Sequence, residues 1–247
     1  MTGSCQGECQ NQGSFDIVMA FQPVADVAAR RIYGYEALVR GANGEGAAQV
    51  LAQVTEANRY AFDQQCRVTA IETAAALGLD RRLSINFLPN AVYHPAACLQ
   101  ATLAAADKHR FPTSLITFEF TENERIQDHA KLEAIIETYR RHGFMTALDD
   151  FGAGYSGLAR LAHYQPDMVK IDRLLISGID GLPRKRAIVG AMLAMADELG
   201  LAVIAEGVET KEEAVTLAEM GIHLFQGYYF ARPVIGKLAA DSEIGWI

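Results

Sequence analysis

Short apolar runs alternate with longer segments of helical spacing along most of this chain. Glycine or proline bounds most of the apolar runs, which is typical of buried strands. We expect strands at 15–24, 32–39, 83–88, 115–122, 144–148, 168–172, 201–206 and 222–230. We expect helices at 47–58, 61–77, 96–106, 130–141, 158–162, 183–199 and 211–220. Such an alternation of strand and helix indicates a parallel sheet with right-handed crossover connections.

The number of strands decides between two parallel architectures. About eight strands in a chain of 247 residues favour a closed α/β barrel over an open, doubly wound sheet. The short link that contains Arg30 and Arg31 favours a hairpin between the first two strands. Residues 1–14 are polar and glycine-rich, so we expect a flexible leader over 1–14 and a single domain over 15–247.

Composition and charge exclude several classes of protein. The apolar fraction of 50% is enough for a sizeable core, and the net charge of −8 argues against a general DNA or RNA binder. No stretch approaches the ~18 consecutive apolar residues of a membrane span, and the N-terminus does not resemble a secretory signal. We therefore expect a cytoplasmic protein that neither inserts into membranes nor binds DNA. Cys5 and Cys9 could bind a metal or sense redox state, but without a further His or Cys nearby a disordered tail is the simpler interpretation.

Polar side chains fall late in, or just after, successive apolar strands. In a parallel barrel the C-terminal ends of the strands converge on one mouth, where active sites lie. We therefore expect these side chains to meet in one pocket. They are Glu36, Asn86, Glu119, Asp149, Lys170, Glu206 and Gln226.

Two adjacent acids, Asp149 and Asp150, end the run 144–148 and precede a glycine-rich turn. Neighbouring residues of an extended strand point to opposite faces. Both acids can therefore face one site only if the chain leaves the extended conformation at Asp150.

Purely structural roles are conceivable for the single residues of this group. Glu36 or Glu119 could form a buried ion pair with an arginine such as Arg40, and Lys170 could pair with Asp172 or with the first acid of the pair. Glu206 could simply open the turn that follows it. As a group, however, the acids have Lys170 as the one cation among them, and packed like charges destabilise a fold.

Divalent cations would relieve this repulsion. Oxygen ligands without clustered His or Cys favour Mg²⁺ or Mn²⁺ over structural zinc. Asp149 could bridge two such ions, an arrangement used for in-line displacement at phosphorus. In this hypothesis Lys170 would hold or polarise the attacking water, and Glu206 could accept its proton.

The segment Tyr35-Glu36-Ala37-Leu38-Val39-Arg40 resembles the signature of EAL domains, the cyclic di-GMP phosphodiesterases. The resemblance continues in family order through Asn86 and the segments 119–122, 149–156, 170–172, 205–210 and 226–233. It implies a modified TIM (β/α)8 barrel with an antiparallel first strand. It also implies hydrolysis of cyclic di-GMP to linear pGpG with two Mg²⁺ or Mn²⁺ ions per active site, and a homodimer.

The same resemblance implies a role for each matching position. Lys170 would hold the catalytic water, Glu206 would act as general base or metal-site glutamate, and Glu36 would take part in catalysis. Glu122 would steady the loop after the acid pair. The implied metal ligands are Glu36, Asn86, Glu119, Asp149, Asp150 and Glu206. The implied substrate-binding residues are Gln22, Leu38, Arg40, Glu209 and Gln226.

The chain departs from the family pattern in two places. Ala153 and Gly157 replace a threonine and a serine in the loop after the acid pair, which is thought to couple metal binding to dimerisation. The family's Trp and His-Pro after the second strand are absent, and 41–46 stands there instead. A catalytically silent EAL domain that binds cyclic di-GMP or a protein is thus one alternative, and another metal-dependent barrel enzyme is a second. A sensory domain, a cyclase domain or a protein partner could lie outside this chain.

Overall fold

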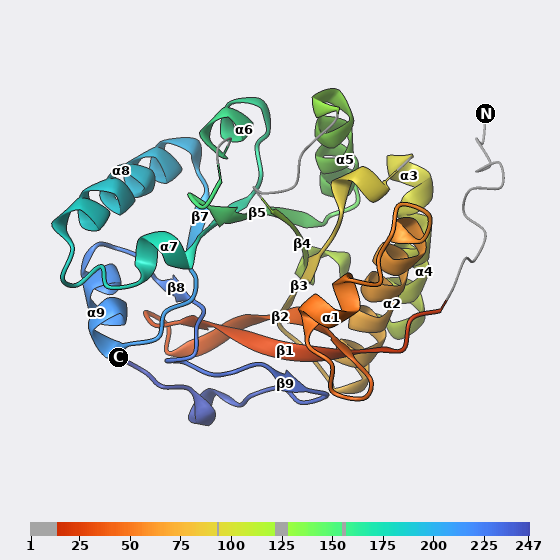
Figure 1. Ribbon diagram of the computed structural model, residues 1–247, viewed down its shortest axis with the longest axis horizontal. Helices are drawn as coiled ribbons and strands as arrows, with labels where there is room; N and C mark the ends of the chain where they lie inside the picture. Colours follow the sequence, from red (N-terminus) through yellow and green to blue (C-terminus); the bar gives the residue numbers. More distant parts are fainter. Residues whose placement is uncertain (1–13, 93, 122–127, 155–156) are drawn as a thin grey trace.

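The strands of the computed structural model close into one barrel (Figure 1). The structure describes residues 14–92, 94–121, 128–154 and 157–247. Neighbouring strands from β2 to β8 are parallel, and β1 closes the ring by pairing antiparallel with both β2 and β8. The strands are β1 (Ile17–Asp26), β2 (Arg31–Gly41), β3 (Arg82–Asn86), β4 (Ile116–Thr121), β5 (Met145–Phe151), β6 (Met168–Ile171), β7 (Ala202–Ala205), β8 (Leu224–Phe225) and β9 (Val234–Ile235). The barrel with an antiparallel first strand is therefore confirmed.

Helices surround most of the barrel (Figure 1). They are α1 (Ala47–Leu51), α2 (Arg59–Ala76), α3 (Pro95–Cys98), α4 (Gln100–His109), α5 (His129–Arg141), α6 (Gly157–His163), α7 (Arg173–Ile176), α8 (Pro183–Leu199) and α9 (Lys211–Glu219). On the side of β1 the barrel is covered by β9 and the C-terminal segment instead of a helix. There Tyr35 donates a hydrogen bond to the carbonyl of Ala239 at 2.5 Å, and Asp241 accepts one from the amide of Ile32 at 2.7 Å. Among the described helices, none combines the length and apolar composition needed to span a lipid bilayer.

Most predicted elements have the predicted type, and the differences are confined to a few segments. The expected helix 96–106 is two helices, α3 and α4, which meet at Leu99. The short helix α7 was not expected. Of the predicted strand 222–230, only Leu224–Phe225 is a strand, and after Phe225 the chain turns against the segment after β7. A side chain at Gly227 would lie 2.0 Å from the carbonyl oxygen of Val208, so this close approach requires glycine.

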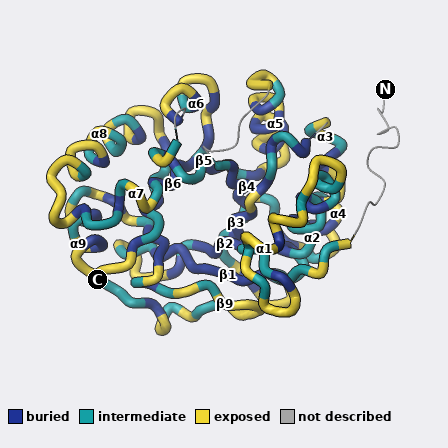
Figure 2. The backbone as a smooth tube through the Cα atoms, viewed as in Figure 1, coloured by how far each residue is buried: buried dark blue, intermediate teal, exposed yellow. Residues whose placement is uncertain are grey.

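The inner face of the barrel has an apolar layer below a polar one. Side chains two residues apart on a strand share a face. Val24, Ala147, Met168 and Ile204 pack together as the apolar layer. Two residues from each of them, on the side of the barrel mouth, lies a polar residue; these are Gln22, Asp149, Lys170 and Glu206. The buried inner strands stand out against the partly exposed outer helices in Figure 2.

Candidate metal centre

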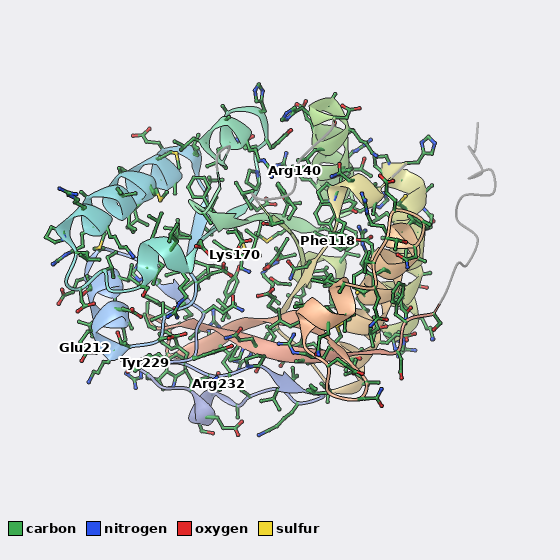
Figure 3. All side chains as sticks on the ribbon, viewed as in Figure 1. Phe118, Arg140, Lys170, Glu212, Tyr229 and Arg232 are labelled. Atoms are coloured by element: carbon green, nitrogen blue, oxygen red, sulfur yellow. The ribbon has the colours of Figure 1, made fainter. Side chains whose placement is uncertain are left out.

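Lys170 is the centre of the polar layer, and its ammonium group is fully buried (Figure 3). Its Nζ lies 2.5 Å from Glu119 Oε2 and 2.5 Å from Glu206 Oε1. It also lies 3.2 Å from Asp149 Oδ1 and 3.3 Å from Glu36 Oε2. Four carboxylates from four different strand ends therefore surround one lysine, as the pattern of strand ends predicts. The alternative ion pairs, of Glu36 or Glu119 with Arg40 and of Lys170 with Asp172, are not found among the described residues.

The acid pair reaches this centre through a local break in β5. Asp150 has φ +55, in the left-handed region, and the register with β6 shifts between Leu148 and Phe151. The predicted departure from the extended conformation at Asp150 is thus confirmed, although the strand resumes at Phe151. The hydroxyl of Thr121 donates to Asp150 Oδ2 at 2.7 Å, and the amide of Asp150 donates to Asp149 Oδ1 at 3.0 Å. These contacts orient both carboxylates.

Two groups of three acids share Asp149. In each group the ligand oxygens lie within 4.8 Å of one another. Glu36 and Glu119 complete the first group, and Asp150 and Glu206 complete the second. Among the described residues, no hydrogen-bond partner meets the buried Oε1 of Glu119, an atom that a cation would satisfy. The donor set consists of hard oxygens, so the residues fit two Mg²⁺ or Mn²⁺ ions.

The electrostatics of the cluster also favour a bound cation. Burial raises the pKa of Glu119 to about 8, since Lys170 offsets only part of this effect and the neighbouring acids add to it. Burial, reinforced by Asp149, also raises the pKa of Glu206 well above its usual value. Burial alone would lower the pKa of Lys170, but the surrounding carboxylates outweigh it and hold the pKa well above the usual range. The lysine is therefore charged, and the cluster still has more acids than positive charge.

Asn86 and Gln226 lie beside Glu36 in the same centre. Asn86 donates to Glu36 Oε1 at 2.6 Å, and Gln226 donates to Glu36 Oε2 at 2.8 Å. Gln226 Nε2 is also 3.4 Å from Gln22 Oε1, and Gln22 donates to the carbonyl of Ala231 at 3.2 Å. The structure thus brings together two of the expected substrate-binding residues, Gln22 and Gln226, with the expected ligand Asn86.

Two cavities adjoin Glu36. One of about 390 Å³ has a mainly apolar wall that includes Leu38, Phe62 and Ile85, and it also reaches Asp149 and Asp150. The other, of about 300 Å³, is lined by polar groups that include Gln22, Glu206 and Glu209. Both cavities thus reach the acid cluster, the first at Asp149 and Asp150 and the second at Glu206.

Not every expected residue points into the centre. The guanidinium of Arg40 donates to the carbonyl of its neighbour Val39 at 2.7 Å. Glu209 forms an ion pair with Arg173, in which Nη2 lies 2.8 Å from Oε2. Glu122, Cys5 and Cys9 lie outside the described residues, as does most of the 1–14 leader. Ala153 is exposed, and Gly157 begins α6.

The sequence interpretation missed Arg173 and Thr121. Arg173 directly follows a strand and the cap residue Asp172, which accepts from the amide of Leu174 at 2.7 Å. Its position just after β6 was the available signal, because residues after successive strands meet at the barrel mouth. Thr121 ends β4 and carried the same signal.

Comparison with solved structures places this fold among known proteins. A standalone versatile EAL protein from Vibrio cholerae O395, in its c-di-GMP bound form, is similar with a TM-score of 0.90 and 48% sequence identity. The match covers 93% of this chain and 97% of that protein's chain. Klebsiella pneumoniae BlrP1, in a manganese and cyclic di-GMP complex at pH 9.0, is similar with a TM-score of 0.85 and 34% identity. The match covers 92% of this chain and 58% of that chain.

Sequence relatives agree with the structural ones. The blue light- and temperature-regulated antirepressor BluF of Escherichia coli (strain K12) is 32% identical over 228 residues, which are 92% of this chain and 56% of BluF. The cyclic di-GMP phosphodiesterase RocR of Pseudomonas aeruginosa is 35% identical over 160 residues, which are 65% of this chain and 41% of RocR. The chain thus spans about half the length of these relatives. Residues 7–233 match the EAL domain, and the chain belongs to the EAL domain family of cyclic di-GMP phosphodiesterases.

Proposed function

We propose that this protein hydrolyses cyclic di-GMP to linear pGpG and that the reaction requires two Mg²⁺ or Mn²⁺ ions. The observation that carries the proposal is the pair of acid groups that share Asp149 beside a buried, charged lysine. A merely structural ion pair would need one carboxylate for Lys170, whereas four surround it.

The metal ligands in this proposal come from five strand ends. They are Glu36, Asn86, Glu119, Asp149, Asp150 and Glu206. When bound, two divalent cations supply charge neutralisation at the phosphate and lower the pKa of water, which makes a nucleophile available at neutral pH.

Lys170 and Glu206 have separate tasks in the proposed reaction. Lys170 stays protonated and donates hydrogen bonds to the attacking water or to a phosphate oxygen. Glu206, whose Oε1 lies 2.5 Å from Lys170 Nζ and whose carboxylate lies beside Asp149 and Asp150, accepts the proton of the attacking water. The water oxygen forms a new bond to phosphorus, the bond to the 3′ oxygen breaks, and that oxygen takes up a proton to become the hydroxyl of pGpG.

The substrate is proposed to lie across both cavities. Its two guanines need separate spaces on either side of the scissile phosphate, and the cavities of about 390 and 300 Å³ both adjoin Glu36. Leu38 offers an apolar wall in the first cavity, and Gln22, Gln226 and Glu209 offer polar contacts in the second. Arg40 would have to leave the carbonyl of Val39 to reach a phosphate or a guanine.

The test is hydrolysis of cyclic di-GMP by the purified protein with Mg²⁺ or Mn²⁺, with EDTA as the control. We expect pGpG only when metal is present. Absence of product under all metal conditions, with the protein folded and monodisperse, would contradict the proposal.

A second candidate is a receptor that binds cyclic di-GMP without cleaving it. The relative named antirepressor, BluF, favours this candidate, because 92% of this chain matches it. Calorimetry distinguishes the two: a receptor would bind intact cyclic di-GMP with EDTA present and yield no pGpG after metal is added.

We further propose that the protein acts as a homodimer in the cytoplasm, where its nucleotide substrate would be met. Leu158 on α6 and Leu174 on α7 are 65% and 62% exposed, and both helices follow strands that carry site residues. Light scattering of the wild type and of Leu158→Asp tests this, with a dimer expected for the wild type alone. A sensory or cyclase domain, or a protein partner outside this chain, is part of the same proposal, since the match covers 56% of BluF and 41% of RocR.

A further inference from the structure

Arg173 connects two neighbouring strand ends at the mouth of the barrel. It is the first residue of α7, just after β6. Its Nη1 donates to the carbonyl of Gly207 at 2.9 Å, and its guanidinium pairs with both carboxylate oxygens of Glu209. Gly207 and Glu209 belong to the turn that follows β7 and Glu206. One side chain therefore bridges from β6 to the turn that carries a proposed metal ligand.

This turn depends on a glycine in a left-handed conformation. Gly207 has φ +65, and a Cβ there would lie 2.6 Å from the Cβ of Arg173. The base of the arginine side chain thus packs directly over the glycine. Because glycine has the widest backbone freedom of any residue, its conformation needs an external restraint to stay fixed.

The backbone on each side of Gly207 is already held. The amide of Glu206 donates to the carbonyl of Ile171 at 3.0 Å, and the amide of Val208 donates to the carbonyl of Gln226 at 3.1 Å. At Gly207 itself, the hydrogen bond that the carbonyl accepts comes from Arg173. The carbonyl of Gly207 and the amide of Val208 belong to one peptide group, which Arg173 and the carbonyl of Gln226 therefore hold from two sides. Without Arg173 the backbone of Gly207 is less restrained, and Gly207 directly follows Glu206, whose carboxylate must face Asp149 and Asp150 to complete the second acid group.

We propose that Arg173 is a positioning residue that fixes the turn after β7 and so keeps the Glu206 carboxylate in the second acid group. The inference rests on the proposed function for the role of that group in metal binding. Arg173 and Glu209 have side chains that are 44% and 41% exposed, and exposed ion pairs add little to the stability of a fold. The role is thus one of local geometry, and its loss weakens the site without unfolding the barrel.

The test compares Arg173→Ala and Arg173→Lys with the control Arg184→Ala, an exposed arginine at the start of α8. Mn²⁺ titration followed by electron paramagnetic resonance measures the affinity of both sites, and hydrogen–deuterium exchange measures the exchange rates of the amides of 206–209 without metal.

For Arg173→Ala we expect roughly tenfold weaker binding at one of two Mn²⁺ sites and faster exchange of the turn, with little change in Tm. Lysine cannot reach both partners at once and should give a smaller effect in the same direction. The kcat should fall and recover at high Mn²⁺, which a merely structural role would not produce.

Unchanged Mn²⁺ affinities together with unchanged exchange in Arg173→Ala would overturn the inference. If that variant fails to fold, Glu209→Gln gives the same test, because it removes the charge that orients the guanidinium. Failure of the proposed function looks different. In that case the wild type itself binds no Mn²⁺ and forms no pGpG, while the exchange of the turn still reports whether Arg173 holds it.

Discussion

Two buried cations of this barrel, Lys170 and Arg67, have opposite surroundings. Arg67 on α2 pairs with Asp63 one turn earlier, with Nη2 2.7 Å from Oδ2, and donates to the hydroxyl of Tyr139 at 2.7 Å. Its guanidinium also lies 5.0 Å from the ring centroid of Phe118. Lys170 meets four carboxylates and no aromatic ring contact of this kind is found for it within the described residues. Arg67 has one carboxylate partner, whereas Lys170 has four.

The difference in charge balance separates a structural site from a functional one. Burial alone would lower the pKa of Arg67, but Asp63 and Tyr139 raise it, so the guanidinium stays charged inside the core. Burial raises the pKa of Asp63, and Arg67 offsets only part of this effect. Asp63 is also occupied by the fold itself, because it accepts the amide of Leu88 at 2.9 Å. Around Lys170, Oε1 of Glu119 has no hydrogen-bond partner within the described part of the chain, and the pKa of this carboxyl is raised to about 8. The Arg67 and Asp63 pair has one carboxylate for one cation, whereas the cluster around Lys170 has surplus acids whose charge a bound cation would neutralise.

The largest expected effect is on activity, from Asp149→Asn. Asp149 belongs to both acid groups, so its neutral analogue weakens both proposed metal sites at once. Loss of several kcal/mol of charge stabilisation in the transition state corresponds to a rate lower by about 1000-fold. The measurement is pGpG formation with saturating Mn²⁺, with Asp167→Asn as a carboxylate control outside the cluster. Activity within tenfold of the wild type would mean that the cluster is not the reaction centre.

The next largest effect is on stability, from Arg67→Met. Removing this partner leaves the carboxylate of Asp63 buried and unpaired, and such a change typically costs about 3 kcal/mol of unfolding free energy. Urea denaturation measures it. The double variant Asp63→Leu/Arg67→Met should be less destabilised than Arg67→Met, because it leaves no buried charge. If the double variant were as unstable as the single one, packing and not charge would explain the loss.

The pH dependence of stability gives a third, smaller contrast. The pKa of Glu119 rises from its usual 4.5 to about 8 in the folded, metal-free protein. A carboxyl with a raised pKa favours the folded state below the usual value, and this contribution is lost as pH rises through about 8. The metal-free protein should therefore have a Tm several degrees lower at pH 9 than at pH 6. Thermal unfolding with and without Mn²⁺ checks this, and a pH dependence that Mn²⁺ leaves unchanged would contradict the role of the cluster as a cation site.

The two cation sites also differ in how far the sequence predicts them. The carboxylates around Lys170 could be placed together because each follows an apolar run, and the barrel brings strand ends to one mouth. The Arg67 and Asp63 pair is local on a helix, but nothing in its spacing indicates that it is buried. Ion pairs four residues apart are common on exposed helix surfaces as well. Burial of this pair depends on the rings that surround it, which come from other strands and helices.

Side-chain orientation was the main limit within the site. The family resemblance assigns Arg40 and Glu209 to substrate binding, but the sequence cannot show that Arg40 turns to its own backbone or that Glu209 pairs with Arg173. The shortening of β8 had a similar cause, since the contact of Gly227 with Val208 joins two separate turns. These features depend on contacts between distant segments, whereas the alternation of strands and helices can be predicted from the local periodicity of apolar residues.

The smallest expected effect comes from the hydroxyl of Thr121, which lies outside both acid groups but donates to Asp150 Oδ2 at 2.7 Å. In Thr121→Val the shape is kept and this hydrogen bond is lost, so the Asp150 carboxylate becomes less fixed. Partners of this kind usually change metal affinity by about tenfold or more. Mn²⁺ titration should show weaker binding at one site, whereas Thr146→Val, which loses a hydroxyl contact to Asp167 on the same barrel, should leave both sites unchanged. Because valine at 121 leaves the charge of the cluster intact, equal affinities in the two variants would show that surplus negative charge alone attracts the ions. Weaker Mn²⁺ binding in Thr121→Val alone would show that the metal centre also depends on the orientation of its carboxylates. The Arg67 and Asp63 pair in the core has no such requirement.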